Sequence, residues 1–212
     1  KMAKGFECDK LDAKAVRFHL DAYMENIRKR SSKIDGNPFR YLQSESWECK
    51  LQDWTHGMDA DFRKRTGYDL RVYLPLILTG QIMGGVEESE KVLWDWRRYL
   101  ADRIARDYYG EIHRFCQENG LIHLGENTGR QQYLYDSVRY HRFSDIPMGE
   151  FWGTNQLRPD NKHAASSAHI TGRSRVAAES FTDRATLEHH PAALKALGDR
   201  AFASGINFFV FH

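Results

Sequence analysis

Apolar residues recur at helical spacing in two parts of the chain. In residues 12–30 they fall on one side of a helix: Val16, Leu20, Tyr23, Met24 and Ile27. A longer series runs between residues 89 and 119 in steps of three or four: Val92, Trp96, Leu100, Ile104, Tyr108, Ile112 and Phe115. Charged residues occupy the opposite side of this series, so it predicts a long amphipathic helix that ends at Gly120. Between the two, residues 60–79 predict one or two helices, interrupted at Gly67 and Pro75.

Short apolar segments predict five strands, at residues 41–47, 121–125, 144–148, 175–178 and 206–211. Helices at about 162–171 and 191–203 separate the last three, and a glycine follows each helix, as it does at many helix ends. Strands that alternate with helices form parallel βα units, because parallel neighbours need a crossover connection. The expected fold class is therefore α/β with a parallel sheet. Prolines are few and no Gly/Ser-rich linker is present, so residues 1–212 are expected to form a single domain.

A glutamate ends or follows four of the five predicted strands: Glu48, Glu126, Glu150 and Glu179. In parallel βα folds the carboxyl ends of the strands share one face, where active sites lie. Carboxylates gathered in one cleft repel one another, which raises the pKa of at least one of them or requires a cation. A carboxyl group with a raised pKa can act as a general acid while an ionised neighbour acts as a base. For any single glutamate, the alternative is a helix N-terminus or a surface position.

Aromatic residues lie near the same strand ends: Trp47, Trp54, Phe151, Trp152 and Phe181. Indole faces suit the C–H surfaces of sugars, and core packing is the alternative for each of these residues. Phe151 and Trp152 beside Glu150 predict an aromatic-walled pocket. His212 ends the last apolar segment at this face and is a candidate ligand contact. The ten histidines show no HExxH metal pattern.

Composition excludes several classes of protein. The chain has 31 Lys and Arg against 29 Asp and Glu, a net charge of +2, so it lacks the basic excess of a nucleic-acid-binding protein. Its apolar runs fall short of the roughly 20 residues that span a bilayer. No apolar stretch follows Lys1–Lys4, so no signal peptide is visible. Three scattered cysteines predict neither a disulfide framework nor a metal knuckle.

Seven short motifs, in this order, carry a resemblance to a known family: GFECDKL (5–11), SWE (46–48), GYDL with YLP (67–75), MGEFW (148–152), AASSAH (164–169), VAAESF (176–181) and LGDR (197–200). Together they make the chain similar to glycoside hydrolase family 106, the α-L-rhamnosidases. The resemblance implies a (β/α)8 TIM-type barrel that removes terminal α-L-rhamnose from rhamnose-containing carbohydrates by an inverting mechanism, with calcium as cofactor.

The same resemblance implies roles for individual residues. Glu48 and Glu179 match the two catalytic glutamates, with Glu48 as the general acid and Glu179 as the base, although the pair is better defined than the two roles. Glu150 is the expected calcium ligand. The expected contacts to substrate are Glu45, Trp47, Glu126, Trp152 and His212, and of these Glu45 and Glu126 are also candidates to hold calcium.

Five strands match only part of such a barrel, about strands four to eight. The chain is therefore expected to be a piece of a larger enzyme, cut on both sides, whose other strands and accessory β domains are its partners. A periplasmic or secreted location is conceivable for that enzyme. Glu45, in place of an expected Asp, and the loops at 55–57 and 125–129 depart from the family pattern. Two other readings stay open: a carbohydrate- or calcium-binding barrel without catalysis, and a barrel glycosidase of another family.

Overall fold

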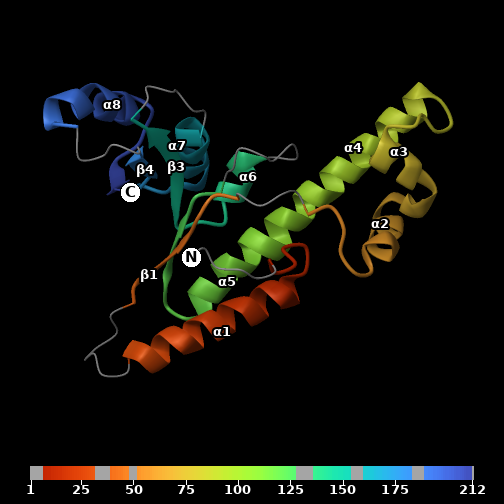
Figure 1. The fold of residues 1–212 in the computed structure, drawn as a ribbon, viewed down its shortest axis with the longest axis horizontal. Helices are drawn as coiled ribbons and strands as arrows, with labels where there is room; N and C mark the ends of the chain where they lie inside the picture. Colours follow the sequence, from red (N-terminus) through yellow and green to blue (C-terminus); the bar gives the residue numbers. More distant parts are fainter. Residues whose placement is uncertain are drawn as a thin grey trace.

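A computed structural model describes residues 7–31, 39–47, 52–127, 136–153, 160–182 and 189–211. Its centre is one sheet of five parallel strands in sequence order: β1 (Tyr41–Ser44), β2 (Ile122–Gly125), β3 (Ile146–Trp152), β4 (Ala177–Thr182) and β5 (Phe208–Phe211). The sheet curls into half of a barrel (Figure 1). The expected α/β fold with a parallel, partial barrel is confirmed.

Helix α1 (Ala13–Ser31) precedes β1. The helices between the strands include α4 (Val86–Arg103), η2 (Ile104–Tyr109), α5 (Gly110–Glu118), α6 (Ser137–His141), α7 (Asp160–Thr171) and α8 (Pro191–Ala203). The long helix expected over 89–119 runs without interruption from Val86 to Glu118, but its middle, η2, is a π-helix. The apolar period predicts the helix and cannot reveal this wider turn. The short helix α6 has too few residues to show a hydrophobic period, so the apolar pattern does not predict it.

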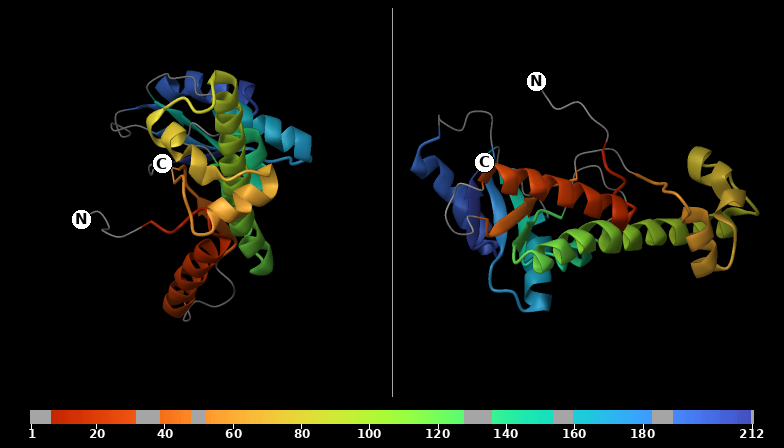
Figure 2. Two further views of the ribbon diagram at one scale, coloured as in Figure 1. Left: turned by 90° about the vertical axis from the view of Figure 1, so that its right-hand side faces the viewer. Right: turned by 90° about the horizontal axis from the view of Figure 1, so that it is seen from below.

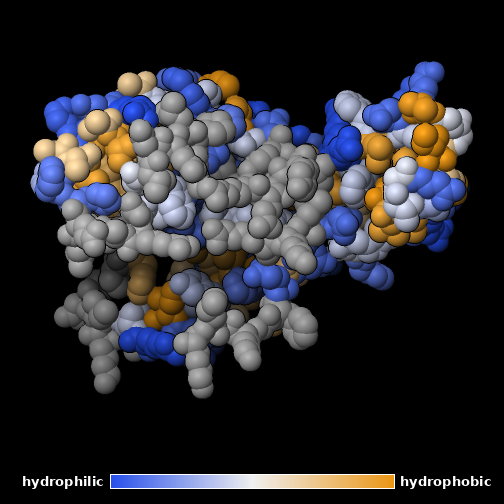
Figure 3. Space-filling model, turned by 45° about the horizontal axis from the view of Figure 1, so that its top comes forward, coloured by the Kyte–Doolittle hydropathy of each residue, from blue (hydrophilic) through white to orange (hydrophobic). Residues whose placement is uncertain are grey.

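A second group of helices forms an arm that points away from the sheet (Figures 1 and 2). It consists of α2 (Met58–Thr66), the 3-10 helix η1 (Leu70–Tyr73) and α3 (Leu74–Thr79) beside the first half of α4. The predicted interruptions are confirmed, since Gly67 ends α2 in a left-handed conformation and Pro75 lies in the first turn of α3. Phe62, Tyr99 and Leu100 form its core. Hydrophobic surface covers part of its far end (Figure 3) and includes Val72, Leu78, Ile82, Val86 and Trp94.

The two faces of the sheet carry different side chains. Leu124, Met148 and Ala177 pack together on the face that we call the lumen, because it lies inside the curl. Phe151 and Ala178 pack on the other face, against α7 and α8. Side chains alternate between the faces of a strand, so residues two positions beyond the lumen residues also face the lumen. That rule places three glutamates of the predicted site on one side of the sheet.

Two strands are longer than predicted, which corrects the position of two glutamates. β3 continues to Trp152 and β4 to Thr182, so Glu150 and Glu179 lie within strands and not after them. β1 is shorter than predicted and ends at Ser44, so Glu45 follows it directly. β1 and β5 each pair with one neighbour among the described residues, which leaves one edge of each strand unpaired. None of the described helices is long and apolar enough to cross a bilayer.

Two histidines are buried in the layer between the sheet and the helices. His123 lies in β2, where its Nε2 is 2.9 Å from Ser44 Oγ and its Nδ1 is 2.8 Å from the Phe143 carbonyl. His141 lies in α6 with no exposed surface. Burial lowers the pKa of His123 to about 4 and that of His141 to about 3. Both side chains are therefore neutral in the folded protein at neutral pH.

This burial predicts a specific sensitivity to acid. The pKa of each buried histidine lies below that of the unfolded chain, near 6.5, so the unfolded state binds more protons as the pH falls. Stability is then lost between about pH 6.5 and the folded pKa, at up to about 1.4 kcal/mol per pH unit for each histidine. His141→Gln removes one of these groups, and urea unfolding at pH 7 and 4.5 should show roughly 2 kcal/mol less loss than in the wild type.

The matched control is His169→Gln, because His169 is exposed on α7 and should leave the acid sensitivity unchanged. Parallel stability curves for wild type and His141→Gln between pH 7 and 4.5 would contradict the assignment of the loss to His141.

Candidate functional site

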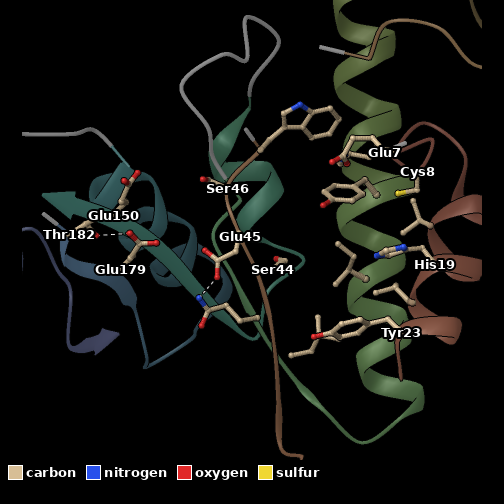
Figure 4. A pocket seen from close by; sticks show the side chains of 18 of the residues that line it. Glu7, Cys8, His19, Tyr23, Ser44, Glu45, Ser46, Glu150, Glu179 and Thr182 are labelled. Carbon is tan, nitrogen blue, oxygen red and sulfur yellow. Dashed lines mark hydrogen bonds and ion pairs between the residues drawn. The ribbon is translucent and has the colours of Figure 1, made fainter. Parts of the chain in front are cut away.

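Four glutamates meet at the carboxyl end of the lumen, and we call them the lumen carboxylate cluster: Glu45, Glu126, Glu150 and Glu179. Figure 4 shows Glu45, Glu150 and Glu179. Glu45 and Glu126 each follow a strand, and the Glu126 N–H donates to the Ser44 carbonyl at 3.0 Å, which keeps the two strand ends level. Glu150 and Glu179 are direct partners in the pairing of β3 with β4. Parallel pairing therefore gathers carboxylates that are separated by up to 134 positions in the sequence (179 − 45 = 134).

Three members of the cluster approach one another closely enough to share a cation. One carboxylate oxygen from each of Glu45, Glu126 and Glu179 lies within 4.8 Å of the other two. Glu126 is the most deeply buried of them, with 1% of its surface exposed, while Glu45 is exposed and Glu179 is half-buried. The cluster is therefore closed to solvent at Glu126 and open to solvent at Glu45.

Glu126 has unusual electrostatics for a carboxyl group. Its pKa is raised to about 9, chiefly by burial and in addition by the charges of Glu150, Glu179, Glu45 and Asp160. Neither of its carboxylate oxygens has a hydrogen-bond partner among the described residues. A buried carboxylate without a partner is costly. Glu126 must therefore carry a proton or sit against a cation, which are the two outcomes expected for crowded carboxylates.

Each of the other three carboxylates accepts a hydrogen bond from its own strand. The Trp152 indole N–H donates to Glu150 Oε1. The Thr182 hydroxyl donates to Glu179 Oε1 at 2.5 Å, and the Gln43 amide donates to Glu45 Oε1 at 2.5 Å. A hydrogen bond donated to a carboxylate restricts its orientation and stabilises its ionised form. Three of the four carboxylates are thus held by defined donors.

Phe181 distorts the end of β4. Its φ of 61° is left-handed, a conformation that costs a bulky residue about 1–3 kcal/mol. The pairing register shifts at this point, so that Phe151 pairs with Ser180 and Trp152 pairs with Thr182. The Phe181 ring packs on the helix side of the sheet, with ring centroids 4.8 Å from Phe151 and 5.4 Å from Phe209. This packing offsets the strain of a β-bulge at Phe181.

A cavity of about 810 Å³ opens beside the cluster. Its lining includes Glu45, Glu150 and Glu179, which are labelled in Figure 4, and also the aromatic residues Trp47 and Tyr108. Trp47 is buried and meets Tyr108 edge to face with ring centroids 5.5 Å apart. The Lys10 ammonium lies over the Trp47 ring, 5.1 Å from its centroid. The cavity thus joins an acidic wall to an aromatic one, as carbohydrate sites do.

The predicted site residues fall in three groups. Glu45, Trp47, Glu126, Glu150, Trp152 and Glu179 all lie at the lumen carboxylate cluster or in the cavity lining. Glu48 and His212 lie outside the described residues. The predicted aromatic wall around Glu150 is wrong for Phe151 and Phe181, which pack on the helix side of the sheet, and Trp54 is 44% exposed and does not line the cavity.

The cavity lining contains residues that sequence reasoning missed, among them Thr182 and Tyr108. Thr182 follows Glu179 by three positions, and simple alternation would point it to the helix side. The bulge at Phe181 turns Thr182 to the lumen. No sequence pattern predicts a bulge at a phenylalanine. Tyr108 was assigned to the apolar face of the long helix, and its place in the π-helix η2 brings its ring to Trp47.

Comparisons with known proteins agree on one family. The glycoside hydrolase family 106 model, described as alpha-L-rhamnosidase, matches residues 1–212. A protein of Formosa agariphila named "Putative beta-glucuronidase" is 36% identical over 213 residues, which cover 100% of this chain and 18% of that protein. The solved structure of a rhamnosidase from Novosphingobium sp. PP1Y matches with a TM-score of 0.87 and 35% identity, over 98% of this chain and 21% of that one. The chain therefore spans about a fifth of the length of these relatives.

Proposed function

Because this chain belongs to glycoside hydrolase family 106, the α-L-rhamnosidases, we propose that it supplies the catalytic half of a barrel that hydrolyses terminal α-L-rhamnosides. The observation that carries the proposal is the lumen carboxylate cluster, whose side chains come from four parallel strands or their ends. Three of them, Glu45, Glu150 and Glu179, line the cavity, and Glu126 lies against Glu45 and Glu179. In parallel barrels this end is where catalytic residues lie. We refer below to the complete protein that contains this chain as the full-length enzyme.

The proposed reaction uses two carboxyl groups on opposite sides of the glycosidic bond. Glu48 donates its proton to the leaving oxygen as the bond from that oxygen to the anomeric carbon breaks. Glu179 takes a proton from a water molecule, whose oxygen forms the new bond to the anomeric carbon on the opposite face. Such a pair needs about 6.5–9.5 Å between its carboxyl groups to admit the water. In support, Glu179 faces the cavity and Glu48 directly follows Trp47, a residue of its wall.

Calcium fits the donors of the lumen carboxylate cluster. It prefers several oxygen ligands, and Glu126 offers two buried oxygens without a partner among the described residues. Glu45 and Glu126 would hold the ion, with Glu179 close enough to share it and Glu150 alongside. When bound, calcium would balance the crowded negative charge and accept hydroxyl oxygens of the sugar.

The experiment that tests this function follows the sugar released by the full-length enzyme. With p-nitrophenyl α-L-rhamnoside, proton NMR during the first minutes should show β-L-rhamnose as the first product, because attack on the face opposite the leaving group inverts the anomeric carbon. First release of α-L-rhamnose would reject the inverting mechanism but leave a rhamnosidase.

A second candidate comes from the name of the Formosa relative. The same assay with p-nitrophenyl β-D-glucuronide tests it directly. Release from the glucuronide and none from the rhamnoside would reject the rhamnosidase assignment. Binding of rhamnose in a calorimeter without release of sugar from any glycoside would favour the binding barrel without catalysis.

A further inference from the structure

The end of β4 departs from regular strand geometry at Phe181, between Glu179 and Thr182. Glu150 and Glu179 are register partners, and each accepts a hydrogen bond from a residue further along its own strand. On β3 the donor is Trp152, two positions after Glu150. On β4 the donor is Thr182, three positions after Glu179. The extra residue on β4 is Phe181, which has the left-handed backbone.

The extra residue decides which side chain reaches the lumen. In a regular strand the residue two positions after Glu179 would share its face, and that residue is Phe181. The bulge instead sends the Phe181 ring to the helix side, where it contacts Phe151, Phe209 and Phe211. Thr182 becomes the partner of Trp152 and lines the cavity, and its backbone carbonyl accepts the Gly153 N–H at 3.0 Å. A hydroxyl therefore stands where an aromatic ring would otherwise block the carboxylate.

We propose that Thr182 is a positioning residue for Glu179, and that the bulge at Phe181 exists to aim its hydroxyl at the Glu179 carboxylate. This inference rests on the proposed function, in which Glu179 is the base that accepts a proton from the attacking water. The Thr182 hydroxyl donates to Glu179 Oε1 at 2.5 Å (Figure 4). Only 5% of the Thr182 surface is exposed, so water competes poorly for this hydrogen bond. A hydrogen bond to one carboxylate oxygen restricts the orientation of the whole group, here on the wall of the cavity. A base that is misplaced slows the chemical step without weakening substrate binding.

The test compares Thr182→Val, which keeps the shape and removes the hydroxyl, with Thr182→Ser, which keeps the hydroxyl. In the full-length enzyme, Thr182→Val should lower kcat about tenfold with KM within about twofold of wild type, and Thr182→Ser should stay near wild type. Thr182→Ala removes the hydroxyl with a smaller side chain and should match Thr182→Val, which covers the case in which valine does not fold. Thr66→Val is the control, because the Thr66 hydroxyl also makes one internal bond, to the Phe62 carbonyl, but lies on the arm.

A wild-type kcat for Thr182→Val, or an equal loss for Thr182→Ser, would overturn the proposal. Crystal structures of Thr182→Val and Thr182→Ser separate this result from a failure of the proposed function. If the wild type hydrolyses no rhamnoside, the proposed function fails, and the position of the Glu179 carboxylate still decides the inference. It should turn away from its wild-type orientation in Thr182→Val and keep it in Thr182→Ser, and an unchanged carboxylate in Thr182→Val would reject a positioning role.

Discussion

Glu179→Gln should lower kcat of the full-length enzyme on p-nitrophenyl α-L-rhamnoside by about a thousandfold or more, since a positioned base contributes roughly 10²–10⁴ to such a rate. The substitution keeps the shape of the side chain and removes its ability to accept a proton. It also removes one negative charge from the lumen carboxylate cluster, where like charges repel. The melting temperature should therefore stay the same or rise while activity is lost, a combination that damage to the fold cannot produce.

Glu87→Gln is the matched control, because Glu87 is 90% exposed in its side chain on α4 and far from the cavity. It should leave both kcat and melting temperature unchanged. Wild-type release of rhamnose by Glu179→Gln would remove Glu179 from the reaction and, with it, the proposed mechanism.

A substrate with a better leaving group shows which glutamate is the general acid and which is the base. A dinitrophenolate leaves without protonation, so loss of the general acid matters little for a dinitrophenyl rhamnoside. Loss of the base matters equally for both substrates, because water must be activated in each case. We expect Glu48→Gln to recover most of its activity on the dinitrophenyl substrate and Glu179→Gln to recover none. The opposite pattern would exchange the two roles.

Local rules predicted much of this site because parallel pairing follows from the order of helices and strands. Once β1 to β4 were recognised as parallel neighbours, Glu45, Glu126, Glu150 and Glu179 had to lie near one edge of the sheet. The long helix over 86–118 was equally predictable, because its apolar residues repeat at helical spacing from Val92 to Phe115, over roughly six to seven turns. Each of these features is indicated by many residues of the sequence at once.

What sequence reasoning missed depends on single residues. The bulge at Phe181 is held by contacts with Phe151 and Phe209, which come from two other strands, so no local pattern around β4 contains it. The unusual state of Glu126 likewise depends on its depth in the lumen. Strand length and burial are set by tertiary packing, which local propensity does not encode.

The calcium site proposed at Glu126 leads to the second large expected effect. In the metal-free protein the pKa of Glu126 is raised to about 9, so the group is protonated at neutral pH. An ion that binds its oxygens must displace that proton. Calorimetric titration of the chelator-treated full-length enzyme with calcium at pH 7 should therefore release close to one proton per ion, measured as a binding heat that differs between two buffers of unlike ionisation enthalpy.

The sign of the pH dependence follows from the same competition. Below the pKa of Glu126, calcium displaces about one proton per ion, and each unit of increase in pH lowers the concentration of competing protons about tenfold. Calcium affinity should therefore rise about tenfold per unit between pH 6 and 8. Glu126→Gln has no proton to release and one charged ligand fewer. It should bind calcium at least about a hundredfold more weakly, with no proton release, and retain little rhamnosidase activity at micromolar calcium. Glu87→Gln should titrate like the wild type. Equal affinity and equal proton release in Glu126→Gln would place the ion elsewhere in the full-length enzyme, because no other described residue combines complete burial with two unpartnered carboxylate oxygens.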